Sequence, residues 1–254
     1  MITESNNIRE DKILRTVFTK LCQEIDKPYI SILIGPRQVG KTYLLRELES
    51  FVRNKGLRVR FFNLENPDDL NLFNQDESGI ASMLGSAGDV VFLDEFHYLK
   101  NATKIFKMLY DTHTRVKIYA SGSSSIEIHK HLKESLAGRF RKTVLGPLIC
   151  DEYQNAGLWD KDTFFRFGGM PGLVHEKTEI EKMALLHNIV ETYLMKDIKA
   201  LIKEENIRAF NHLLHLMASW QGGCVIGTGN RALESCYSAL LKYFGGYLCL
   251  FRCE

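Results

Sequence analysis

The stretch "LIGPRQVGKTYLL", residues 33–45, joins three local patterns in a short length of chain. An apolar run ends at Gly35, a loop follows as far as Gly40, and a leucine-rich pattern that suits a helix begins at Lys41. The middle of the stretch, "GPRQVGKT", has the spacing GxxxxGK[ST], and it stands between an expected strand and an expected helix. This context favours a phosphate-binding loop over an ordinary glycine turn.

The spacing of the loop has a physical reason. Backbone N–H groups must curl around a phosphate, and Gly35 and Gly40 permit conformations and a close approach that a side chain would hinder. Lys41 is expected to bridge the β- and γ-phosphate oxygens, and the Thr42 hydroxyl to take one coordination place on Mg²⁺. The predicted nucleotide-binding residues are Gly35, Pro36, Arg37, Gln38, Val39, Gly40, Lys41 and Thr42, of which Arg37 and Gln38 are interpreted as exposed loop residues.

Short, β-rich and mostly apolar runs recur along the first 150 residues, and helical patterns separate them. We expect strands at 29–34, 58–64, 89–95, 116–122 and 141–148. We expect helices at 8–25, 41–55, 78–86, 101–112 and 125–136. The alternation of strand and helix predicts an α/β fold, in which helices wrap a parallel sheet whose strands are buried on both faces.

A carboxylate for the metal is expected where the run "VVFLDE" ends. A buried strand of this form delivers Asp94 to the carboxyl edge of the sheet, so Asp94 is the predicted second Mg²⁺ ligand beside Thr42. The adjacent Glu95 is placed to orient and polarise an attacking water molecule. Adjacent carboxylates at a strand end are also found merely solvated, but the phosphate-binding loop makes that interpretation the weaker one. Hydrolysis, and not binding alone, is therefore predicted.

Two further residues are candidates for the chemistry. The fourth expected strand ends "YASGSSS", where Ser121 or Ser123 could hydrogen-bond the γ-phosphate or the water; an ordinary serine-rich helix start explains the serines equally well. In "LAGRFRKT", residues 136–143, Arg139 or Arg141 could offset charge on the transferring phosphoryl group, although surface arginines are common. Of these we select Ser121 and Arg139 as catalytic candidates beside Glu95.

The pattern becomes mainly helical after about residue 150, with helical stretches at 151–157, 179–202 and 207–220. We predict a phosphate-loop domain over 1–150, an α-rich lid or linker over 151–205, and an incomplete or degenerate winged-helix segment over 206–254. The glycines and the short elements of the last part are too little for an independent domain of ordinary size.

Charge and composition set few limits on partners. The formal net charge of +2 is far from the strong basicity that by itself indicates nucleic-acid binding, so a DNA or protein partner and a homo-oligomer all stay open. The six cysteines form neither a CxxC pair nor a zinc-binding spacing. Without an apolar run of roughly 18 residues or an apolar leader, we expect a cytoplasmic protein that does not enter the membrane.

The motifs together resemble a large prokaryotic family of AAA-type P-loop ATPases, which typically carry a winged-helix segment and a C-terminal domain of unknown function. The resemblance rests on their order from residue 10 to 219: "GPRQVGKTYLL", "VVFLDEFHYL", "YASGSSS", "SLAGRFRKTVLGPL", "FFRFGGMPGLV", "ETYLMKDI" and "NIRAFNHLLHLMAS". It implies ATP and Mg²⁺ as cofactors, a catalytic Glu95, and a five-stranded sheet of order 5-1-4-3-2. The resemblance weakens after about residue 220, and we expect the C-terminal domain to be absent, as in a truncated or frame-shifted chain.

Four functional hypotheses follow. The first is a Mg²⁺-dependent ATPase whose nucleotide cycle moves the α-rich region against the sheet. A helicase normally needs two α/β domains of this kind, and the length supplies one. A P-loop kinase would not need Glu95 beside Asp94 and would usually carry an arginine-rich lid. A non-catalytic, nucleotide-dependent interaction module stays open. ATP rather than GTP rests on the resemblance, because no NKxD motif follows near the later strands.

Overall fold

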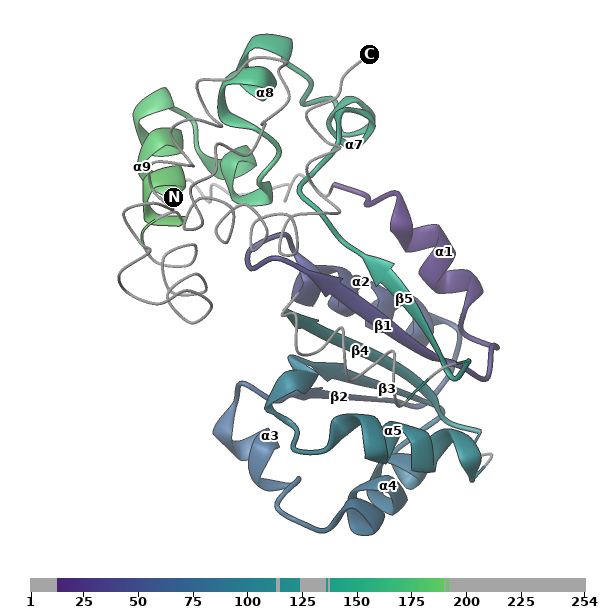
Figure 1. Cartoon of the computed structure of the whole chain (residues 1–254). Coiled ribbons are helices and arrows are strands. Elements are labelled where there is room, and N and C mark those ends of the chain that lie inside the picture. Colours follow the sequence, from purple (N-terminus) through teal and green to yellow (C-terminus); the bar gives the residue numbers. More distant parts are fainter. Residues whose placement is uncertain (1–12, 113–114, 124–135, 137, 190, 192–254) are drawn as a thin grey trace, which may run out of the picture. The chain divides into compact units, whose positions relative to one another are not determined.

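The chain divides into two compact units, residues 1–176 and 177–254. The structure, a computed structural model, describes residues 13–112, 115–123, 136, 138–189 and 191 (Figure 1). The expected helix at 207–220 and the expected winged-helix segment at 206–254 lie outside these residues, as does the helix at 125–136 except for Leu136. The domain boundaries therefore stay predictions.

The first unit is built on a parallel sheet of five strands in the spatial order β2-β3-β4-β1-β5. The strands are β1 (Ile30–Gly35), β2 (Val59–Asn63), β3 (Val90–Asp94), β4 (Lys117–Ser123) and β5 (Phe140–Val144). This is the order 5-1-4-3-2 that the family resemblance implied, so the predicted fold is confirmed. β1, first in the chain, lies between the fourth and fifth strands, with Leu33 opposite Ser121 on one side and Thr143 on the other.

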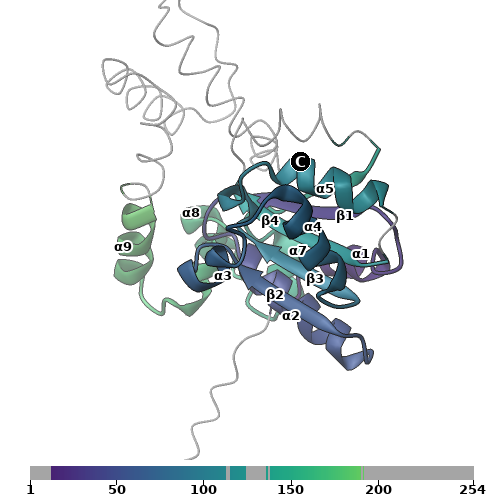
Figure 2. The same ribbon diagram turned by 90° about the horizontal axis from the view of Figure 1, so that it is seen from below.

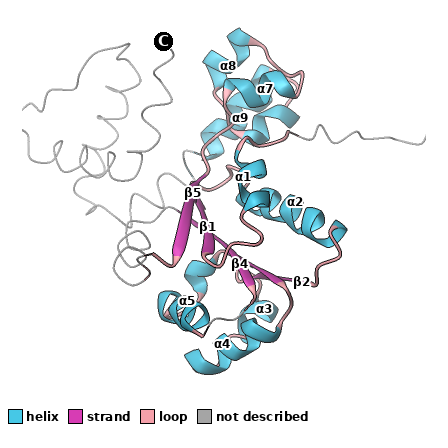
Figure 3. Cartoon of the chain, turned by 90° about the vertical axis from the view of Figure 1, so that its right-hand side faces the viewer, coloured by secondary structure: helices cyan, strands magenta, loops and turns pink. Residues whose placement is uncertain are grey.

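Helices cover both faces of this sheet. They are α1 (Val17–Gln23), α2 (Lys41–Asn54), α3 (Pro67–Asn71), α4 (Glu77–Ser86) and α5 (Ala102–Asp111). Figure 3 shows α1 and α2 on one side of the strands and α3 to α5 on the other, and Figure 2 shows α2 and α5 on opposite sides from below. Because successive strand residues face opposite ways, Ile32 and Ile34 pack toward α4 and α5, whereas Leu33 packs toward α2. The central strands are therefore apolar on both faces.

Polar side chains mark the starts of three helices. Asn66 accepts a hydrogen bond from the Asp68 N–H ahead of α3, and Asp76 accepts one from the Gly79 N–H ahead of α4. Asp160 does the same for α8 (Lys161–Phe167), accepting from the Thr163 N–H. Such caps satisfy backbone donors that have no partner inside the helix.

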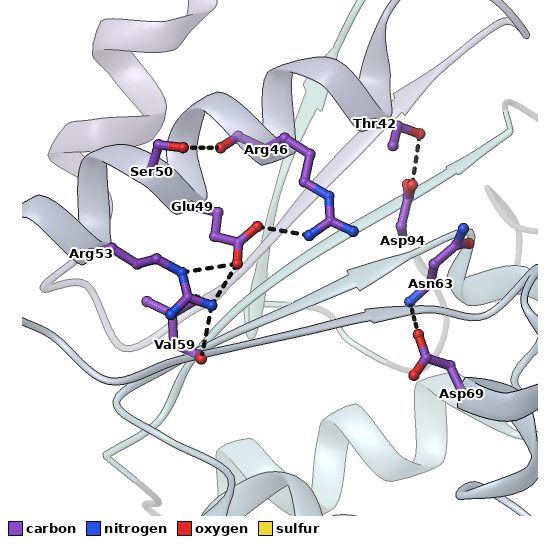
Figure 4. A network of polar contacts seen from close by, with 9 residues as sticks. All are labelled: Thr42, Arg46, Glu49, Ser50, Arg53, Val59, Asn63, Asp69 and Asp94. Atoms are coloured by element: carbon purple, nitrogen blue, oxygen red, sulfur yellow. Dashed lines mark hydrogen bonds and ion pairs between the residues drawn. The ribbon is translucent and has the colours of Figure 1, made fainter.

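A ladder of charges fixes α2 to the sheet (Figure 4). Glu49 accepts from Arg46 at 2.8 Å and from Arg53 at 2.7 Å, one turn away on either side. The Arg46 guanidinium lies 3.4 Å from the centre of the Phe61 ring on β2, and Arg53 reaches the Val59 carbonyl at 3.4 Å. The helix that follows the loop of residues 35–40 is thus tied to the edge strand β2 as well as to β1.

The chain leaves the sheet earlier than the pattern indicated. β5 ends at Val144 and not at 148. The Leu145 N–H still donates to the Ile34 carbonyl of β1 at 2.8 Å, and Gly146 and Pro147 then suit a turn, because proline has no N–H to donate to a ladder. The elements that follow in the first unit are α7 (Cys150–Asn155), α8 and the 3₁₀ helix η2 (Pro171–His175). In the second unit the structure describes α9 (Glu179–Ile189), the first part of the helix expected at 179–202.

Candidate functional site

The loop between β1 and α2 has the backbone that its glycines predict. Gly40 adopts φ 87°, and Gln38 also lies in the left-handed region, with φ 62°. A Cβ on Gly35 would come within 2.2 Å of the Leu145 carbonyl oxygen, so no larger residue fits where the loop leaves β1. The turn places the first residue of α2, Lys41, at the carboxyl edge of the sheet.

Lys41 is a buried cation with few partners. Its side chain is 4% exposed, and Nζ donates to the Pro36 carbonyl at 3.0 Å and lies 3.7 Å from Glu95 Oε1. Burial lowers the pKa of Lys41 below its usual value, and the nearby carboxylates of Glu95 and Asp94 oppose that shift without cancelling it. An anion at this point would therefore stabilise the charged lysine.

Asp94, the last residue of β3, joins two hydroxyl groups from neighbouring elements. The Thr42 hydroxyl donates to Asp94 Oδ2 at 2.6 Å (Figure 4), and the Ser121 hydroxyl of β4 donates to Asp94 Oδ1. Asp94 is 1% exposed and Ser121 is fully buried. Ser121 lies within β4 and not at a helix start, because β4 extends to Ser123. The sheet order, with β4 between β1 and β3, brings these groups together.

Glu95, the next residue, has a left-handed backbone conformation, with φ 54°. Its N–H donates to Ser121 Oγ at 3.3 Å, and its carboxylate, 19% exposed, lies 3.1 Å from His97 Nδ1. Burial raises the pKa of Glu95, but the contact with His97 and the charge of Lys41 outweigh burial, so the pKa lies below its usual value. The carboxylate is ionised at neutral pH and faces the same space as Lys41.

Arg139 lies elsewhere in its own chain. It directly precedes β5, whose first residue, Phe140, pairs with Ile30 at the start of β1, whereas the loop follows the end of β1. Its guanidinium donates to Asp111 Oδ1 at 2.8 Å and is 31% exposed. The structure thus brings Lys41, Thr42, Asp94, Glu95 and Ser121 together at one edge of the sheet, and places Arg139 at the opposite edge.

Three contributors to the site were not predicted from the sequence. Arg15, ahead of α1, donates to the Val39 carbonyl of the loop at 2.7 Å. His97, two residues after Glu95, contacts the carboxylate of Glu95. A Cβ on Gly122 would lie 2.9 Å from the Phe96 ring, so the glycine in "YASGS" makes room for the residue that follows Glu95. No motif marked Arg15, because only the folded chain brings it to the loop.

A cavity of about 310 Å³ adjoins the loop. One wall comes from Gly40 and Tyr43 at the start of α2, and Ile13 and Arg15 contribute another. The remaining wall comes from the chain after β5 and is formed by Leu148, Pro171, Gly172 and His175. The lining is mostly apolar, which suits a flat, weakly polar group beside the phosphate-binding loop.

The fold and the site define a P-loop protein of the AAA class. A family model described as an AAA domain matches residues 27–154, half of the chain, and the chain therefore belongs to this family. A second model, for a domain of unknown function, matches residues 160–229. That match corrects the expectation that a C-terminal domain of unknown function is absent.

Proteins of similar sequence occur in an archaeon and in a bacterium. An uncharacterised protein of Methanocaldococcus jannaschii is 25% identical over 209 residues, which cover 74% of this chain and 46% of that protein. An uncharacterised protein of Mycobacterium tuberculosis is 23% identical over 188 residues, covering 74% of this chain and 40% of that protein. The chain thus spans about half the length of the curated relatives it matches.

The fold also occurs among solved structures. A Walker-type ATPase of Pyrococcus abyssi superposes with a TM-score of 0.59 at 17% identity, over 92% of this chain and 91% of that one. At this identity the likeness establishes the fold alone. Within the part of the chain that the structure describes, every helix is too short or too polar to cross a bilayer.

Proposed function

We propose that the chain binds Mg²⁺-ATP at the loop of residues 35–42 and hydrolyses it to drive a conformational switch. The observation that carries the proposal is the buried Lys41, whose charge is incompletely matched by Glu95 at 3.7 Å and which stands at the end of a phosphate-loop motif. Family membership supports nucleotide binding. The triphosphate supplies the anion that Lys41 lacks, and the left-handed Gly40 lets the backbone approach it.

The donor set at the end of β3 fits Mg²⁺. Thr42 and Asp94 offer a hydroxyl and a carboxylate oxygen, the hard ligands that this cation prefers. No cluster of three or more His, Cys, Asp or Glu side chains suited to a metal occurs among the described residues. Phosphate oxygens and water would therefore complete the coordination, and the bound ion would neutralise charge on the phosphates.

Each residue of the site has a separate role in this proposal. Lys41 binds the phosphates and Ser121 holds the Asp94 carboxylate in place through its hydroxyl. Glu95, ionised and held between Lys41 and His97, orients the attacking water and polarises its O–H bond. The cavity beside Gly40 takes the adenine and ribose end of ATP, with Tyr43 and Leu148 on its walls.

The same cavity supports the switch. Its lining includes residues of the loop and residues of η2, so the occupant contacts both the sheet and the segment that follows it. An occupant of the cavity would contact Pro171, Gly172 and His175 on one side and Gly40 and Tyr43 on the other. When it leaves, η2 is no longer linked to the loop through it. We propose that the switch operates in the cytoplasm. It would act within a homo-oligomer or on a DNA or protein partner.

Hydrolysis by the purified chain, measured with several nucleoside triphosphates and with or without DNA, tests the proposal. Lys41→Ala should abolish ATP binding, because the loop then loses its fixed cation. Glu95→Gln should bind Mg²⁺-ATP about normally and hydrolyse it at least ~100-fold more slowly.

Unchanged ATP affinity in Lys41→Ala would contradict the phosphate-binding assignment. Equal hydrolysis by Glu95→Gln and the wild-type chain would contradict the role of Glu95. A wild-type chain that binds ATP and never turns it over would favour the non-catalytic interaction module instead.

A further inference from the structure

Arg15 links three separate segments around the loop. This side chain is 7% exposed and comes from the segment just before α1. Its guanidinium donates from NH1 to the Val39 carbonyl at 2.7 Å, and from NH2 to the Gly146 carbonyl at 2.7 Å and the Pro147 carbonyl at 3.3 Å. Nε donates to Glu152 Oε2 at 3.1 Å. A lysine cannot make all these contacts at once, because it lacks the planar fork of donors.

The partner carboxylate is equally well held. Glu152, on α7, is 2% exposed. Its Oε1 accepts from the Thr16 N–H at 2.7 Å and from the Thr16 hydroxyl at 3.1 Å, and its Oε2 also accepts from the Ile149 N–H at 3.2 Å. The pair therefore joins the segment before α1 to the start of α7, with its polar atoms satisfied inside the protein.

The contact with Val39 bears directly on the loop. The Val39 carbonyl and the Gly40 N–H belong to one planar trans peptide, so the bond from Arg15 turns the Gly40 N–H away from Arg15. The guanidinium also occupies the space behind Gly40, because NH1 lies 3.8 Å from the position that a Cβ there would take. Arg15 thereby limits the rotation of the peptide at the point where the loop enters α2.

We propose that Arg15 is a positioning residue that couples the loop to the chain after β5. It orients the Val39–Gly40 peptide for a phosphate and holds Gly146, Pro147 and Glu152 against the same loop. Arg15 and Gly40 both line the cavity of about 310 Å³. The Arg15 guanidinium would thus fix the position of the loop wall relative to the wall that follows β5. The inference rests on the proposed nucleotide site and adds the route by which occupancy of that site reaches α7.

Arg15→Lys tests the proposal, with Arg58→Lys as a matched control. Arg58 also pairs with a carboxylate, Asp89, at 2.9 Å, but its side chain is 76% exposed and it precedes β2 at the other edge of the sheet. Arg15→Lys should weaken binding of ATP, and of inorganic tripolyphosphate, at least 10-fold, and should change kcat less than threefold. Arg58→Lys should leave both affinities unchanged. Wild-type affinity in folded Arg15→Lys would overturn the proposal.

Hydrogen exchange supplies a readout that a general loss of stability would not reproduce. In the protein without nucleotide, Arg15→Lys and the milder Glu152→Gln should speed exchange in the peptide spanning 36–42 and leave the peptide spanning 59–63 unchanged. In the wild-type protein, ATP should slow exchange over 146–152, and in either variant that protection should be lost. Equal exchange over 36–42 in wild type and Glu152→Gln would overturn the coupling even if Arg15→Lys did not fold.

The nucleotide site and the coupling through Arg15 can be refuted independently of each other. A wild-type protein that binds neither ATP nor tripolyphosphate would refute the nucleotide site, while the exchange comparison on the unliganded chain would still decide whether Arg15 sets the loop's mobility. A wild-type protein that binds ATP, with loop exchange indifferent to both variants, would refute the coupling alone.

Discussion

Lys117 shows what burial does to a single charge in this protein. The residue is 5% exposed, and its ammonium donates to the Tyr29 carbonyl at 2.7 Å and lies 4.6 Å from the centre of the Tyr29 ring. Burial lowers the pKa of Lys117 from 10.5 to about 8, although the charge of Glu24 opposes the shift. The folded chain therefore releases this proton at a lower pH than the unfolded chain does.

The sign of the pH effect follows from that difference. Between pH 8 and 10.5 the unfolded state carries a proton on this lysine that the folded state has lost, so the contribution of Lys117 to stability rises with pH. The free energy of unfolding of the wild-type chain, measured relative to Lys117→Met, should increase by about 2 kcal/mol from pH 7 to pH 10. Chemical denaturation at several pH values measures it. Parallel curves for the two proteins would contradict the shift.

Single residues differ in how far sequence could identify them. A short motif and the end of an apolar run were enough to mark Lys41, Thr42 and Asp94 as candidates. Arg15 could not be marked in this way, since its contacts to Val39 and to Glu152 join residues far apart in the chain. The pairing of His97 with Glu95 depends on a left-handed turn at Glu95, a backbone state that no local pattern predicts for a glutamate.

Helices longer than two turns, such as α2 and α4, were predicted to within a few residues. So were the central strands, which are marked by apolar runs. The short helices α3 and α8 were missed, because five or seven residues are too few to show a helical period. Their starts were nevertheless marked by Asn66 before Pro67 and by Asp160, which are the capping signals that a search for periodicity overlooks. The neighbours of β1 became known only through the family resemblance.

The packing of β4 against the turn after β3 makes a prediction at the scale of elements. Gly122→Ala should place a methyl group 2.9 Å from the ring of Phe96, which is 2% exposed and cannot move outward freely. The substitution should lower the free energy of unfolding by about 1–3 kcal/mol, as overpacking of a core does. Denaturant unfolding of Gly122→Ala measures the loss.

The same substitution made in a Phe96→Leu protein tests whether the Phe96 ring causes the loss of stability in Gly122→Ala. Phe96→Leu removes the edge of the ring that the new methyl group meets, so Gly122→Ala should be less costly in Phe96→Leu than in the wild-type chain. The four proteins form a double-mutant cycle, and a coupling free energy indistinguishable from zero would show that Phe96 is not the obstacle.

At the scale of the whole molecule, the placement of Arg139 determines how it could act. It lies at the edge of the sheet opposite the loop and pairs with Asp111, so it stands away from the nucleotide site proposed for its own chain. We predict an arginine finger that acts in trans. Arg139→Ala should bind ATP and lose at least ~10³-fold in turnover, because such residues meet charge that develops in the transition state.

Mixing variants tests whether the finger crosses between subunits. Lys41→Ala keeps Arg139 but has an empty nucleotide site, so adding it to Arg139→Ala should restore part of the hydrolysis. Arg141→Ala is the control, since Arg141 is two residues further along the chain and its guanidinium lies 4.9 Å from the centre of the Tyr29 ring, just ahead of β1. Normal turnover by Arg139→Ala alone would refute the role, and a mixture that stays inactive with monomeric protein would refute its action in trans.

The central position of β1 has a consequence for how the chain is made. Both of its neighbours, β4 and β5, emerge from the ribosome long after it, and at 5–20 residues per second the about 80 residues that separate β1 from β4 take about 4–16 s to synthesise. During that interval β1, all of whose residues are buried in the folded protein, has no strand beside it, while β2 and β3 can already pair. The strand that precedes the loop of residues 35–42 is therefore the one that waits longest for a neighbouring strand during synthesis.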